Sequence, residues 1–121
     1  VKVIVNRAGF IAARTCEYDG LNNIEDPYEW KITLHASNGS PLTIIETWLK
    51  SRISIKSLLD WYTRAKLLFD HALANGGIYH IWGHSHEFRS SEDWCKLEKL
   101  FDYISSRKDV CYLTNRDVFN Y

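Results

Sequence analysis

Two stretches with helical spacing of apolar residues constrain the fold of this chain more than any other feature. In the first, residues 57–60 fit a capping box, and apolar residues then follow at three- and four-residue steps. These apolar positions are Leu58, Trp61, Tyr62, Ala65, Leu68, Phe69 and Ala72. Gly76 and Gly77 end the predicted helix, because glycine readily adopts the backbone conformation of a helix C-cap.

A second helix is predicted to start at residues 90–93, where acidic residues follow the capping serine. Its expected buried positions are Trp94, Leu97, Leu100, Phe101 and Ile104. Residues 78–82 lie between the two helices, residues 110–114 follow the second, and both runs have strand-like composition. Alternation of strands and helices is typical of parallel α/β units, and not of a sandwich or a bundle.

The amino-terminal third is predicted to add further strands. Residues 10–15 and 31–35 are strand candidates, and residues 36–41 form a cluster of turn formers. Residues 1–5 are β-branched and predict a strand on propensity alone, with Ala8 and Gly9 closing that element. No linker or repeat divides the chain, so residues 1–121 are expected to form one α/β domain or part-domain.

Composition excludes several classes of protein. With 45% hydrophobic and 25% charged residues the chain is not a disordered tail, and a net charge of zero does not favour binding to nucleic acid. No apolar run approaches the roughly 18 residues that a membrane span needs, and the start does not resemble a secretory signal. Because the sequence has no Met, we expect a processed chain or a piece of a longer protein.

Three cysteines, Cys16, Cys95 and Cys111, are widely spaced and odd in number. They predict buried thiols rather than a thiolate metal site, and this pattern leaves the compartment unknown while favouring the cytoplasm. Aromatic residues reach 14%, which suits a packed core and also a binding platform.

The strongest candidate site is residues 80–87, which contain His80, His84, His86 and Glu87. The three histidines fall at even positions, so in an extended chain they would face one way. Imidazoles there could move a proton, bind a metal or donate to an oxyanion, because parallel strands present their carboxyl ends to loops that carry function. The spacing matches no closed zinc motif. A small metal-binding protein built on these histidines therefore remains only an alternative.

Residues 77–87, followed by Trp94, Leu97 and residues 112–115, resemble the carboxyl-terminal part of polysaccharide deacetylases of the fourth carbohydrate esterase family. Residues 8–10, 13–15 and 30–35 fit the same likeness, which is most specific at residues 82–85 and spans the whole chain. The resemblance implies part of an irregular (β/α) barrel that removes acetyl groups from carbohydrate polymers with a divalent metal, usually zinc.

In this resemblance His84 occupies the position of the late catalytic histidine, which protonates the leaving amine. Residues placed at the substrate are Trp82, Trp30, His35, Arg14 and His86. Asp26 and Glu29 are loosely similar to a family carboxylate motif, but Glu29 departs from it, and a solvated charge pair is the favoured interpretation.

The family's Asp-Asp and His-x-x-x-His motifs, which carry the base and metal ligands, do not occur in this sequence. A whole barrel takes about 250 residues, so 121 residues correspond to about half. The resemblance thus implies the back half of a deacetylase, completed by an amino-terminal half or by self-association, with residues 1–7 as the end of a helix. A non-catalytic binding or interaction module with the same ancestry is the alternative.

The resemblance and the α/β pattern together predict a geometry. We expect Thr15, His35, His84 and Thr114 to converge at one rim, with His84 partly exposed and in contact with Trp82 or Trp30.

Overall fold

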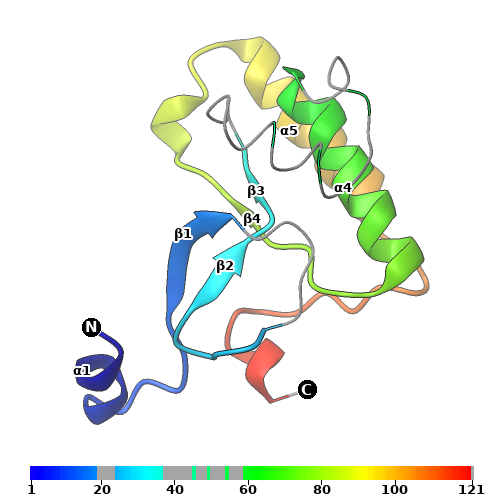
Figure 1. Ribbon diagram of the computed structural model, residues 1–121. Helices are drawn as coiled ribbons and strands as arrows, with labels where there is room; N and C mark the ends of the chain where they lie inside the picture. Colours follow the sequence, from blue (N-terminus) through cyan, green and yellow to red (C-terminus); the bar gives the residue numbers. More distant parts are fainter. Residues whose placement is uncertain (19–23, 37–44, 46–48, 50–53, 55–58, 121) are drawn as a thin grey trace.

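The computed structural model describes residues 1–18, 24–36, 45, 49, 54 and 59–120. Short parallel strands lie on one side of the molecule, and the two long helices, α4 (Trp61–Asn75) and α5 (Ser91–Ile104), run side by side on the other (Figure 1). The predicted mixed α/β class is therefore confirmed. Within the described ranges the strands form two pairs and no closed barrel.

The strands are short and parallel. β1 (Arg14–Tyr18) pairs with β2 (Trp30–Ile32), and β3 (Leu34–His35) pairs with β4 (Ile81–Trp82). Between β2 and β3 the amide and hydroxyl of Thr33 hydrogen-bond to the carbonyls of His80 and Ile78. The stretch from β2 to β3 is thus a continuous central segment with β1 on one side and β4 on the other.

The core lies between the β3–β4 pair and the two helices. Its buried members are Leu34, Ala36, Trp61, Ala65, Leu68 and Leu100, against which Tyr79 and Ile81 also pack. Because neighbouring residues of a strand point to opposite faces, His35, His80 and Trp82 face away from the helices. One face of the sheet therefore packs against the core, and the other face carries the two histidines and the tryptophan.

The helix ends follow from specific side chains. Asp60 caps α4, since its carboxylate accepts hydrogen bonds from the Thr63 amide at 2.9 Å and the Thr63 hydroxyl at 2.8 Å. The predicted earlier start at residue 57 lies outside the described residues. Gly76, with φ of 75°, ends α4 as predicted. The capping box of Ser90 and Asp93 that starts α5 is also confirmed.

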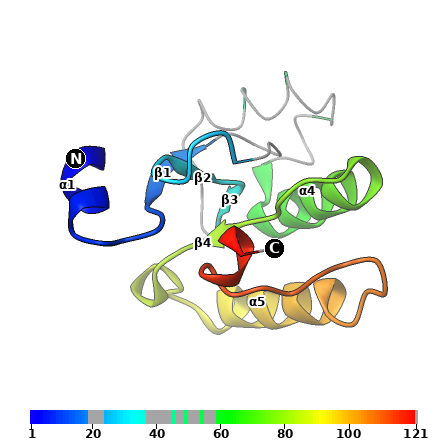
Figure 2. The same ribbon diagram turned by 90° about the horizontal axis from the view of Figure 1, so that it is seen from below.

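At the amino terminus, α1 (Lys2–Arg7) replaces the strand that β-propensity predicted, and the helix implied by the resemblance is correct. Lys2 holds this helix to the loop before β2 by ion pairs to Asp26 at 2.8 Å and Glu29 at 2.6 Å. Those two carboxylates are thus a charge pair on the surface. In both views α1 lies far from α4 and α5 (Figures 1 and 2).

Several sequence predictions are wrong. Residues 110–114 form no strand: Tyr112 donates its hydroxyl to the Ile104 carbonyl and accepts the Arg107 amide, which ties the segment to the end of α5 instead of a sheet. The first strand begins at Arg14 and not at residue 10. Trp94 and Phe101 are about half exposed, because the buried stripe of α5 is narrower than its apolar pattern.

The prediction of buried thiols is also wrong. Cys16, Cys95 and Cys111, all within the described ranges, are exposed, and none forms a disulfide. The spacing of the cysteines did not place them in the core, because β1, α5 and the 109–118 segment each leave residues open to solvent.

Candidate functional site

His84 lies at the turn that follows β4, where the chain passes very close to the end of β3. A Cβ atom on Gly83 would lie 3.3 Å from the Cβ atom of Ala36, so glycine permits this approach. The turn continues as the 3₁₀ helix η1 (Ser85–Glu87), which His84 begins. His84 is exposed, and its ring centroid lies 6.4 Å from that of His35. The expected pairing of these two strand ends is confirmed.

Glu87 fixes the backbone of this turn. Its Oε2 atom accepts a hydrogen bond from the His84 amide at 3.0 Å, and its own amide donates to the His84 carbonyl at 3.0 Å. This reciprocal bonding holds His84 at one place beside the sheet. His84 itself is extended, but η1 is helical, so the extended chain on which the strand-alternation prediction depends ends at His84. His86 nevertheless stacks on His84, whereas His80 stacks on Trp30.

The same Glu87 oxygen lies 3.3 Å from Nε2 of His35, whose side chain is only 12% exposed. Burial lowers the pKa of His35, while the charge of Glu87 raises it and His84 and Arg64 lower it further. The net effect is a lowered pKa. His35 is therefore mostly neutral near pH 7, with its Nε2 atom facing the Glu87 carboxylate.

Aromatic rings form a row beside this pair. The Trp82 ring lies 4.6 Å from both the His35 and the His84 rings, and His86 stacks on His84 at 5.0 Å. The Arg14 guanidinium lies 5.4 Å from the centre of the Trp82 ring. Five of the six predicted site residues, Arg14, His35, Trp82, His84 and His86, thus lie in one group, which we call the His84 rim.

Trp30 lies elsewhere. It is 7% exposed, stacks on His80 with ring centroids 4.2 Å apart, and meets the edge of Phe119. Thr15 hydrogen-bonds to the Trp30 carbonyl, and Thr114 bonds to Asp117 at the start of η2 (Asp117–Phe119). The predicted convergence of Thr114 with the rim is wrong, because Thr114 does not follow a strand.

Two further residues influence the rim and were not singled out from the sequence. Arg64 is buried on α4, and burial lowers its pKa while Tyr18 and Asp60 raise it. Burial raises the pKa of Tyr18, because its charged form is an anion. The charge of Arg64 opposes this shift, and the charge of Glu87 adds to it. The signal was available for Arg64, because it lies three positions after Trp61 and four before Leu68, on the apolar stripe of α4.

The part of the chain that the structure describes contains no complete set of metal ligands. No three His, Cys, Asp or Glu side chains there converge closely enough to hold an ion. Among the same residues, no helix has the length and apolarity needed to cross a bilayer.

Comparison with known proteins gives no relative. Neither family models, nor curated proteins, nor solved structures match the chain.

Proposed function

We propose that the His84 rim is the proton-donating side of a hydrolase site that removes acetyl groups from a carbohydrate polymer. In this proposal the chain is the back half of a polysaccharide deacetylase-like barrel. The observation that carries it is an exposed histidine, placed between Trp82 and His86 beside the His35–Glu87 pair.

The proposed role of His84 is to give a proton to the amine or alcohol that leaves when the acetyl bond breaks. A general acid must reach within about 3 Å of the atom that it protonates, and an exposed ring on a fixed turn can do so. Glu87 positions the turn, and His35 holds Glu87 from the neighbouring strand. Neither needs to touch the substrate for this role.

The proposed role of Trp82 is to pack against the apolar face of a sugar ring, with Arg14 above it donating to sugar hydroxyls. His86, stacked on His84, would limit the rotation of the acid. Trp30 is buried and pairs with Arg14 between β1 and β2, so in this proposal it positions Arg14 rather than contacting the polymer.

The divalent metal implied by the resemblance does not fit the described residues as a complete site. The proposal therefore requires that its ligands, and the base, come from an amino-terminal half. The roles proposed for this chain are limited to holding the polymer and giving the proton.

Acetate release tests the proposal directly. It is measured on N-acetylated and O-acetylated sugar polymers, with this chain alone and with the chain joined to or mixed with an amino-terminal half that carries the metal ligands. We expect release only from the complete protein, and His84→Ala should lower its rate by roughly 10²–10⁴-fold.

A matched control is His71→Ala, because His71 lies on α4 and hydrogen-bonds to Asn75, away from the rim. It should leave the rate unchanged. Full activity of the His84→Ala protein, or no release from any acetylated polymer by the complete protein, contradicts the proposal.

A second candidate is a non-catalytic interaction module. It is favoured by α1, which buries none of its residues, and by the exposed apolar side chains of Val3, Ile4 and Phe10 beside it. Sedimentation separates the possibilities: concentration-dependent assembly without acetate release favours the module, whereas a monodisperse monomer counts against it.

A further inference from the structure

Arg14 is the cationic side chain of the His84 rim. It is exposed on β1, and its guanidinium lies 5.4 Å from the centre of the Trp82 ring. Among the described residues, no carboxylate forms an ion pair with Arg14, whereas Lys2 and Lys96 each pair with two carboxylates. Arg14 also donates no hydrogen bond within the described ranges. Its five N–H groups can therefore serve a ligand.

The side chains around Arg14 suit a ligand that is an anion. His84 and His86 are exposed, and an imidazole ring carries at least one N–H group that can donate a hydrogen bond. Glu87 is an acidic residue beside the rim, but its Oε2 atom accepts the His84 amide and lies 3.3 Å from Nε2 of His35. The carboxylate of Glu87 thus already has partners within this group, and the donors of Arg14 do not.

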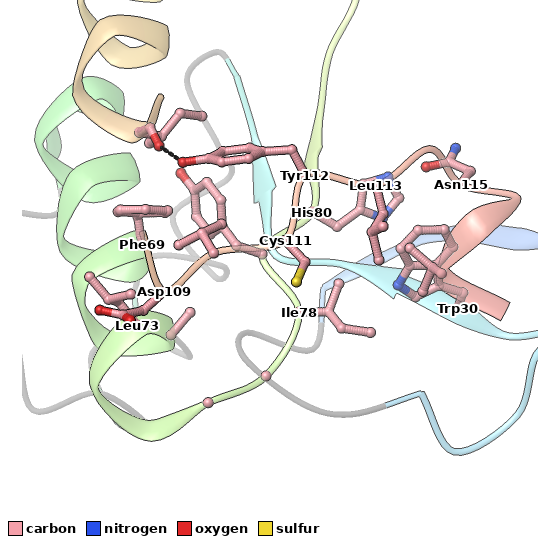
Figure 3. A pocket seen from close by; sticks show the side chains of 17 residues that line it. Trp30, Phe69, Leu73, Ile78, His80, Asp109, Cys111, Tyr112, Leu113 and Asn115 are labelled. Carbon is pink, nitrogen blue, oxygen red and sulfur yellow. Dashed lines mark hydrogen bonds between the residues drawn. The ribbon is translucent and has the colours of Figure 1, made fainter. Parts of the chain in front are cut away.

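A cavity of about 520 Å³ lies at the opposite end of β4 from the rim and is less suited to an anion. It is bounded by the end of α4, the start of the β4 segment and the segment 109–118 (Figure 3). Trp30, Phe69 and His80 line it, and the described residues of its wall include Asp109 but no lysine or arginine. Because the Asp109 carboxylate repels anions, an acidic ligand should prefer the rim.

We propose that the polymer bound at the His84 rim is acidic: a sugar ring that packs against Trp82 carries a carboxylate, and Arg14 binds that carboxylate. This inference rests on the proposed function and names the class of its substrate. In a uronic acid the carboxylate is attached directly to the sugar ring, so a ring beside Trp82 keeps it within reach of Arg14. The planar guanidinium matches a carboxylate, which can accept two parallel N–H bonds.

Binding of matched oligosaccharides to this chain tests the role of the carboxylate. The probes are oligogalacturonate and its fully methyl-esterified form, which has the same sugar rings without the negative charges. By calorimetry at low salt, the acid should bind about tenfold more tightly than the ester, and added salt should reduce this difference. Equal binding of acid and ester overturns the proposal. Equally tight binding of polyphosphate, which has no sugar ring for Trp82, also overturns it.

Arg14→Gln should bind the acid and the ester alike, because it removes the charge. Arg107→Gln is the matched control, since the Arg107 guanidinium also lies over an aromatic ring, 4.8 Å from the centre of Tyr103, but beyond the end of α5. It should keep the tenfold preference. Loss of the preference in both variants, or in neither, contradicts the role of Arg14. The comparison of acid and ester on the unaltered protein holds even if a variant does not fold.

Failure of this inference is distinguishable from failure of the proposed function, because the binding measurement needs no acetate release. If the complete protein releases acetate but the chain binds acid and ester equally, the proposed function stands and the acidic substrate is wrong. If oligogalacturonate binds through Arg14 but no acetylated polymer loses acetate, the acidic sugar site stands and the proposed function is wrong.

Discussion

The Nε2 atom of His35 lies 3.3 Å from Oε2 of Glu87, and this contact joins the end of β3 to the turn after β4. The same carboxylate oxygen accepts the His84 amide at 3.0 Å. One oxygen therefore links the two strand ends and the backbone of the candidate acid. The position of His84 therefore depends on this link as well as on β4, which contains only two residues.

Glu87→Gln should lower the pKa of His35. Burial already lowers that pKa, and the negative charge of Glu87 is the principal influence that opposes it. An amide keeps the size of the side chain and removes the charge. An NMR titration of the His35 ring measures the effect, and Glu98→Gln on the exposed face of α5 is the control. An unchanged His35 titration in Glu87→Gln would show that the pair does not persist in solution.

Stability should fall as the pH drops from about 7 to about 5. Burial lowers the pKa values of His35 and His80 in the folded protein below the ordinary value of 6.5. As the pH falls below 6.5, these two histidines therefore take up protons in the unfolded chain before they do so in the folded protein. The stability that their neutral rings contribute is fully present above pH 6.5 and is lost as the pH falls through the folded pKa values.

Urea denaturation across this pH range measures that loss. His80→Phe should make the free energy of unfolding less dependent on pH than in the unaltered protein, and Glu98→Gln should not. If the free energy of unfolding depends on pH in the same way in His80→Phe as in the unaltered protein, His80 does not contribute to the loss of stability.

Leu68→Ala should destabilise the protein far more than Leu73→Ala, although both residues lie on α4. Leu68 is 1% exposed within the core, whereas Leu73 is 40% exposed. The first change should cost about 2–5 kcal/mol, and the second under about 1 kcal/mol. Helix propensity changes equally in both, so chemical denaturation reports the difference in burial. Similar losses for the two variants would place the core elsewhere.

The sequence by itself determined the elements whose cause is local. The body of α4, its end at Gly76 and the start of α5 at Ser90 follow from apolar periodicity, a glycine and a capping box. These signals act between residues a few positions apart, so they do not require knowledge of the fold. The strand-forming composition of residues 110–114 was equally clear but insufficient, because a strand also needs a partner strand, and Tyr112 ties this segment to α5.

Only the tertiary structure decided which histidines act together. His80 and His84 are four residues apart, yet His80 contacts Trp30 at the cavity while His84 lies beside His35. Strand alternation alone placed His80, His84 and His86 on one face. The helical turn that starts at Ser85 ends that alternation, and the pairing of β3 with β4 brings His35 next to Trp82 and the turn that carries His84. Such contacts join residues about fifty positions apart, and their geometry follows from packing, which local sequence patterns do not encode.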